Sequence, residues 1–179
     1  MKTTTRDDSR RKFLAGAWEL FRRGKQATRA ILLGAFAVML SASSALAGNP
    51  VRPLSLSCET TFAFNATGAI DLQGICHYSH LGLTTTSAVQ IAIPQPNGSL
   101  HIVDTIVYTA ANGDKLFATF VGTGFFTATG VSFSGVETYA GGTGRFEHAS
   151  GASALAGSAT FTAPTSGIGE FSGHGTLSY

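Results

Sequence analysis

The side chains that could perform acid–base chemistry are spread thinly over the chain. Residues 48–179 hold seven carboxylic acids, with no close pair among them, and all five histidines. General acid–base catalysis usually needs paired carboxylates or a histidine oriented by one. Folding could gather five candidates whose strands have converging inner faces, namely His80, His101, Asp104, Tyr108 and Glu137. A structural role is favoured over catalysis for each, so the catalytic residues stay unknown.

Aromatic side chains form a second group of candidates. They favour a packed core in general, but the interior of a small β-barrel either fills with side chains or holds one small ligand. We therefore expect a small apolar ligand to be the partner of such an interior. The predicted ligand-binding residues are Tyr78, His80, Tyr108, Phe120 and Phe133.

Motifs for other chemistries are absent from the sequence. It contains no G-x-S-x-G, C-x-x-C or H-E-x-x-H pattern. A phosphate-binding G-x-G-x-x-G beginning at Gly142 would need glycine where Glu147 stands. His77 and His80 follow Cys76, but on a strand they point to opposite sides, which disfavours a metal site. We predict no cofactor and no metal.

The elements that must position these residues are β-strands. Residues 54–65 alternate apolar and polar side chains with period two, which is typical of a half-buried strand. Further strands are expected at 69–78, 84–93 (with Val89, Ile91 and Ile93 on one face), 99–110, 115–121, 131–140, 152–162 and 168–179. Residues 122–130 are expected to form a loop or bulged piece. No helical period follows residue 48, so the fold class is all-β, either a barrel or a sandwich.

The only two cysteines fall into register in the first predicted hairpin. Residues 66–68 suit a three-residue turn with Gly68 in the left-handed conformation, which pairs Asn65 with Ala69. Continuing that register places Cys58 opposite Cys76 and favours a disulfide. The alternative is two buried free thiols, and a slip of one residue would put the two cysteines on opposite faces. Asn112-Gly113 predicts a second tight hairpin with a type I′ turn.

The stretch 141–151 has the composition of a sharp turn between two strands. Its glycines allow tight backbone geometry, and Phe146 follows as an apolar plug. The run Gly141-Gly142-Thr143-Gly144-Arg145-Phe146-Glu147-His148-Ala149-Ser150-Gly151 resembles a segment of the allene oxide cyclase and dirigent group of small β-barrels, including secreted bacterial members. The resemblance implies an eight-stranded antiparallel barrel in which the last strand pairs with the first. In plant relatives such an interior binds an oxidised lipid or guides phenoxy-radical coupling. No run here matches their catalytic residues.

The amino terminus differs in composition from the remainder. Residues 1–47 contain nine of the twelve basic residues, and a short apolar run at 30–40 leads to Ala45-Leu46-Ala47. This pattern predicts a secretory signal peptide cleaved after Ala47. The apolar run is shorter than the ~20 residues that span a bilayer, so no stable membrane span is expected after processing. Residues 9–14 also resemble the twin-arginine export motif, so the general and twin-arginine routes both stay open.

Residues 48–179 are expected to form a single barrel domain, secreted or periplasmic. Their three bases against seven acids give a net charge of −4, which disfavours a nucleic-acid partner. A non-catalytic barrel that binds a small apolar ligand is the first functional hypothesis. A cyclase, isomerase or dirigent-like coupling protein is the alternative, and an envelope interaction module is the second alternative. The sequence assigns no oligomeric state.

Overall fold

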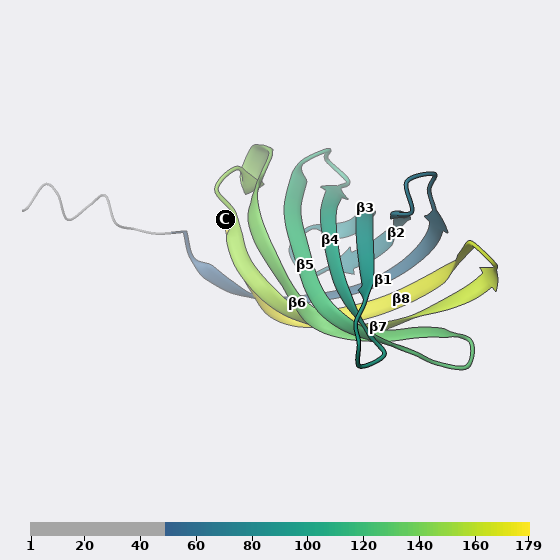
Figure 1. The fold of residues 1–179 in the computed structure, drawn as a ribbon. Helices are drawn as coiled ribbons and strands as arrows, with labels where there is room; N and C mark the ends of the chain where they lie inside the picture. Colours follow the sequence, from purple (N-terminus) through teal and green to yellow (C-terminus); the bar gives the residue numbers. More distant parts are fainter. Residues whose placement is uncertain (1–48) are drawn as a thin grey trace, which may run out of the picture. The chain divides into compact units, whose positions relative to one another are not determined.

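The computed structural model describes residues 49–179, so the predicted signal peptide and its export motif lie outside the described residues. The described part is a closed antiparallel barrel in which each strand pairs with the next and β8 pairs with β1 (Figure 1). This confirms the predicted all-β class and the eight-stranded barrel. The strands are β1 (Val51–Phe64), β2 (Ile70–Tyr78), β3 (Gly82–Pro94), β4 (Ser99–Ala110), β5 (Lys115–Phe126), β6 (Gly130–Gly142), β7 (Ser150–Ala163) and β8 (Ser166–Ser178).

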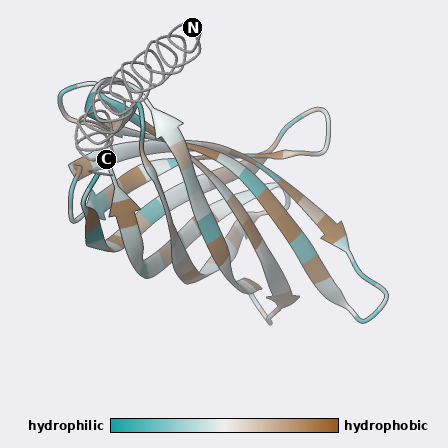
Figure 2. Ribbon diagram, turned by 90° about the vertical axis from the view of Figure 1, so that its left-hand side faces the viewer, coloured by the Kyte–Doolittle hydropathy of each residue, from teal (hydrophilic) through white to brown (hydrophobic). Residues whose placement is uncertain are grey.

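Buried and exposed residues alternate along β1 and β5. Figure 2 shows hydrophobic and hydrophilic bands along the strands of the barrel. On β1, Leu54, Leu56 and Cys58 point inward, as their period-two spacing predicts. On β3 the apolar row Val89, Ile91 and Ile93 shares one face as predicted, but this face is outside. The inward row of β3 begins with Thr84 and Thr86, whose small side chains leave space for larger neighbours in the narrow interior.

Residues 122–130 do not form the expected loop or bulged piece. β5 continues as a regular strand to Phe126, and only residues 127–129 form a turn. Gly122 and Gly135 face each other on β5 and β6, and a Cβ at either position would collide with the ring of Phe120. These glycines therefore make room for a buried aromatic side chain and do not end the strand.

The first hairpin forms in the predicted register. Cys58 lies opposite Cys76 and the two form a disulfide. Gly68 has a φ of 84°, as the three-residue turn requires. The turn at Asn112-Gly113 has a different type from the predicted I′, because only Gly113 has a positive φ while Asn112 does not. The Gly113 N–H donates to the Ala110 carbonyl, so a three-residue loop connects β4 to β5.

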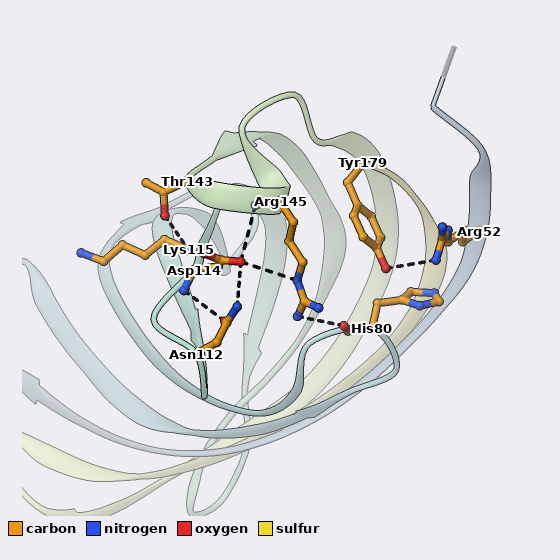
Figure 3. A network of polar contacts seen from close by, with 8 residues as sticks. All are labelled: Arg52, His80, Asn112, Asp114, Lys115, Thr143, Arg145 and Tyr179. Atoms are coloured by element: carbon orange, nitrogen blue, oxygen red, sulfur yellow. Dashed lines mark hydrogen bonds and ion pairs between the residues drawn. The ribbon is translucent and has the colours of Figure 1, made fainter. Parts of the chain in front are cut away.

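One end of the barrel is capped by the turn between β6 and β7. A single 3-10 turn, η2 (Gly144–Phe146), buries Phe146 completely, which confirms the predicted apolar plug. Gly141 and Gly144 both have positive φ. A polar network fixes this cap: Arg145 donates to the His80 carbonyl and lies 3.8 Å from the Asp114 carboxylate (Figure 3). Within residues 49–179 the opposite end of the barrel has no such cap, and no helix there is long and apolar enough to cross a membrane.

Candidate functional site

An internal cavity of about 90 Å³ lies between the middle of the barrel and its uncapped end. Its wall is apolar almost throughout, because inward-facing positions of all eight strands contribute phenylalanine, isoleucine, leucine and alanine side chains. Phe62, Phe120, Phe133 and Phe171 supply aromatic surface. Such a wall selects apolar ligands, and the polar groups that interrupt it decide orientation and specificity.

Asp104 is the carboxylic acid in this wall. It lies on β4, faces inward and is 9% exposed. Its Oδ1 is buried and is the one buried side-chain oxygen or nitrogen within residues 49–179 that has no hydrogen-bond partner. Buried polar atoms are nearly always paired, since an unpaired one costs about 1–3 kcal/mol. Asp104 therefore contributes a carboxyl group to the lining of an apolar cavity, and one of its two oxygens has no hydrogen-bond partner.

A second buried carboxylic acid lies nearby but is fully satisfied. Asp104, Phe120, Glu137 and Ser153 occupy one register row across β4, β5, β6 and β7, so all four point inward at the same level. Phe120 stands between the two acids. Glu137 is completely buried and does not line the cavity.

Glu137 is held by three hydroxyl groups. The Tyr108 hydroxyl donates to Oε1 at 2.6 Å, and the Tyr139 hydroxyl donates to Oε2 at 2.6 Å. Ser153 Oγ donates to Oε2 at 3.3 Å, and the Tyr78 hydroxyl donates to the Tyr139 oxygen at 2.8 Å. Every polar group in this cluster has a partner, so the cluster favours one arrangement of the core side chains. It leaves no free acceptor for a ligand.

Burial dominates the electrostatics of both acids. It raises the pKa of Asp104 from 3.8 to about 7, with a smaller contribution from the negative charge of Glu137. Burial also raises the pKa of Glu137, although the hydrogen bonds from Tyr108, Tyr139 and Ser153 oppose that shift. The pKa values of Tyr78, Tyr108 and Tyr139 are raised by burial first and by the Glu137 charge second. These hydroxyls therefore stay protonated and act as donors.

The five predicted ligand-binding residues fall into three places. Phe120 and Phe133 line the cavity. Tyr78 and Tyr108 belong to the Glu137 cluster, where both hydroxyls are already used. His80 lies in the turn after β2 at the capped end, with Nε2 2.6 Å from the Pro53 carbonyl oxygen and its ring beside Tyr179 (Figure 3).

Whether an acid–base candidate points into the barrel or out of it depends on its phase along the strand. Asp104, Tyr108 and Glu137 point inward, as expected for converging inner faces. His101 points outward because it is an odd-numbered residue of β4, whose even-numbered residues fill the core. His80 is not on a strand at all.

Two members of the cluster, Tyr139 and Ser153, were not predicted. Tyr139 is in phase with Glu137 on β6, a signal that could have identified it. Ser153 becomes a partner only through the register between β6 and β7. Within the described residues, no group of three histidine, cysteine or acidic side chains is arranged to hold a metal ion.

A larger depression, of about 890 Å³, lies on the outer surface over β7, β8 and β1–β4. Threonine and serine side chains predominate in its wall, with Glu59 and Glu170 directly opposite each other on β1 and β8. It is open to solvent, and each acid there is exposed. We therefore take the smaller internal cavity, with its buried unpaired acceptor, as the candidate site.

Comparison with solved structures gives a structural likeness. The chain is similar to the solved structure of the pterocarpan synthase dirigent protein GePTS1, at 13% sequence identity and a TM-score of 0.43, over 74% of this chain and 92% of that chain. Neither the protein-family models nor the curated proteins give a match. The assignment of the barrel rests on the strand pairings described above.

Proposed function

We propose that the barrel binds a small, largely apolar molecule carrying one hydrogen-bond donor, and that Asp104 accepts that hydrogen bond. The unpaired Oδ1 of Asp104 at the wall of an apolar cavity is the observation that supports this most strongly. A ligand donor would satisfy the oxygen, and the aromatic wall would cover the remaining ligand surface.

The size of the cavity limits the ligand. Its 90 Å³ is well below the ~300–1,000 Å³ of pockets for drug-sized molecules. An apolar cavity of about 150 Å³ holds benzene, so one small ring is the upper limit for a ligand here. Phenol and toluene form a matched pair of probes, because they have nearly the same shape and differ only in that phenol carries a hydroxyl group where toluene carries a methyl group.

Calorimetric titration of the wild-type chain and an Asp104→Leu variant with both probes tests the proposal. At pH 8, above the Asp104 pKa of about 7, we expect the wild type to prefer phenol by about tenfold or more, since a hydrogen bond to a charged acceptor contributes about 1.5–3 kcal/mol. The leucine variant should lose this preference and bind toluene at least as well as phenol. Equal binding of the two probes by the wild type, or an unchanged preference in the variant, would refute the proposal.

Proton transfer is a second candidate function, and the placement of Asp104 supports it. A carboxyl group with a pKa of about 7 facing an apolar cavity can act as acid or base near neutral pH. This corresponds to the cyclase, isomerase or coupling hypothesis. Exchange of the α-hydrogens of cyclohexanone in D2O, followed by NMR, is the simplest test. Exchange that rises with pH around 7 and vanishes in Asp104→Asn would support it, and background rates would count against it.

We infer a secreted or periplasmic location for this function. The Cys58–Cys76 disulfide supports it, because disulfides persist mainly in oxidising compartments. Amino-terminal sequencing of the protein recovered from its host tests the predicted cleavage. A chain that begins at Gly48 is expected, and a chain that retains residues 1–47 would contradict the inference.

A further inference from the structure

Three phenylalanines surround the uncapped end of the barrel. Phe64, Phe126 and Phe161 lie at or near the ends of β1, β5 and β7, in phase with the inward-facing rows. They extend past the closed part of the wall and are 42%, 64% and 38% exposed. We call these three residues the aromatic rim.

Two members of the rim, Phe64 and Phe161, are continuous with the cavity. Phe161 stacks on Phe64 with ring centroids 6.5 Å apart, and it meets Phe62 edge to face at 5.4 Å. Phe62 and Phe161 both line the cavity. The rim is also held by backbone hydrogen bonds between neighbouring strands and turns: the Phe64 N–H donates to the Thr165 carbonyl and the Phe161 N–H donates to the Thr129 carbonyl. Phe64 and Phe161 are therefore fixed to the neighbouring turns at the opening of the cavity.

Charge is absent from the turns that surround this opening. The connections at residues 65–69, 95–98, 127–129 and 164–165 contain no aspartate, glutamate, lysine, arginine or histidine. Within three residues of these turns the strands add only Asp71, whose Oδ1 accepts from the Asn65 amide, and the outward-facing His101. All three bases of residues 48–179, Arg52, Lys115 and Arg145, lie at the capped end (Figure 3).

We propose that the uncapped end docks on a lipid bilayer with uncharged headgroups, with the aromatic rim among the acyl chains. Exposed aromatic side chains ringed by polar, uncharged groups suit the bilayer interface, where apolar rings enter the hydrocarbon and hydroxyl and amide groups meet the headgroups. The absence of a basic cluster at this end argues against attraction to anionic lipids. This goes beyond the proposed ligand binding, because docking does not depend on Asp104. It gives an apolar molecule a route from bilayer to cavity that avoids water.

Tryptophan reporters in the full chain test this orientation. The only native tryptophan is Trp18, so a Trp18→Phe background is silent. Phe126→Trp places the reporter on the rim, and Leu83→Trp is the matched control. Leu83 is an exposed apolar residue (56%) near the start of β3, away from the uncapped end. Both variants share the same amino-terminal segment, so a difference between them reports on the barrel.

With phosphatidylcholine vesicles containing brominated acyl chains, we expect the Phe126→Trp emission to shift to the blue and to be quenched. The Leu83→Trp emission should not change. Adding Phe64→Ser and Phe161→Ser to the Phe126→Trp variant should weaken the apparent binding by about tenfold or more, since each ring loses part of its apolar contact. Residues 1–47 carry nine basic residues that can attract anionic lipid in both reporter variants. Partial replacement of phosphatidylcholine by phosphatidylglycerol should therefore not increase the quenching of the Phe126→Trp reporter relative to that of the Leu83→Trp reporter.

Equal quenching of the two reporters, or none at Phe126→Trp, would overturn the proposal. A blue shift without vesicles together with a doubled sedimenting mass would instead assign the rim to a contact between two copies. Hydrogen exchange of the unaltered chain provides a check that needs no variant. Vesicles should protect residues 124–131 and leave residues 111–117 unchanged, and the reverse pattern would contradict docking. Phenol titration without vesicles keeps this test separate from the proposed ligand binding.

Discussion

Replacing Asp104 by asparagine should change how the stability of the barrel depends on pH. In the unfolded chain this carboxyl titrates near 3.8, whereas burial raises its pKa to about 7 in the folded chain. Between these values the unfolded state has lost the proton and the folded state still holds it. The free energy of unfolding should therefore fall as pH rises, by about 1.4 kcal/mol per pH unit for this one group.

The size of this change in the free energy of unfolding follows from the difference between the two pKa values. A shift from 3.8 to about 7 corresponds to about 4 kcal/mol of stability that is fully present below pH 3.8 and lost once the pH exceeds 7. Asp104→Asn keeps the shape and removes the titration. Glu137 is retained in the variant, so its own raised pKa contributes to both proteins. The difference between the two stabilities isolates Asp104.

Urea unfolding of both proteins at pH 4.5, 5.5, 6.5 and 7.5 measures this difference. The wild type should lose stability relative to Asp104→Asn over that range, and the change should level off above pH 7. Because the Glu137 charge is the second cause of the shift, Glu137→Gln should move the midpoint of the loss to lower pH. A stability difference that is flat, or that grows in favour of the wild type as pH rises, would refute the account of a desolvated, unpaired carboxyl.

Three further predictions concern what holds the barrel together. Glu137→Leu removes the acceptor of the Tyr108 hydroxyl and leaves the Tyr139 and Ser153 hydroxyls with a hydrogen bond to each other, in which only one of the two can donate. Two buried donors are then unpaired, and at about 1–3 kcal/mol for each the variant should lose at least about 2 kcal/mol in urea unfolding. Glu137→Gln keeps an acceptor and should cost less, so equal losses would argue against the network. Replacing Cys58 and Cys76 together by serine should cost about 3 kcal/mol for a loop closed over 18 residues, and an unchanged urea midpoint would contradict that contribution. Phe146→Ala should lower the free energy of unfolding by about 3–5 kcal/mol, measured by thermal unfolding. Phe117→Ala, on the outer face of β5, should lower it far less. Similar losses in the two variants would show that Phe146 does not plug the barrel.

The parts of the fold that the sequence predicts are those with strong local signals. The period-two pattern of β1 and β2, together with a turn that needs Gly68, specifies their register and hence the Cys58–Cys76 pair. The prediction was wrong where a glycine makes room for a side chain elsewhere in the barrel and does not mark a loop. Gly122 resembles loop punctuation in the sequence, yet it lies in a strand and accommodates the ring of Phe120 together with Gly135 on the next strand.

The candidate site is only partly predictable for a related reason. Strand phase brings Asp104, Tyr108 and Glu137 inside, and a careful count of phase would have excluded His101. The division of the two acids into one that is satisfied and one that is not depends on the register across four strands and on the position of Phe120. No local pattern carries that information, because each strand contributes only one or two of the groups.

The most direct test of ligand binding at Asp104 is carbon-13 NMR of its carboxyl group during titration with phenol. A donor that bonds to the charged form stabilises it, so the pKa of Asp104 should fall from about 7 when phenol is bound. Phenol should accordingly bind more tightly at pH 8 than at pH 5, and toluene should not lower this pKa. If phenol binds while the Asp104 resonance and its pKa remain unchanged, the molecule binds elsewhere and the proposed function is wrong.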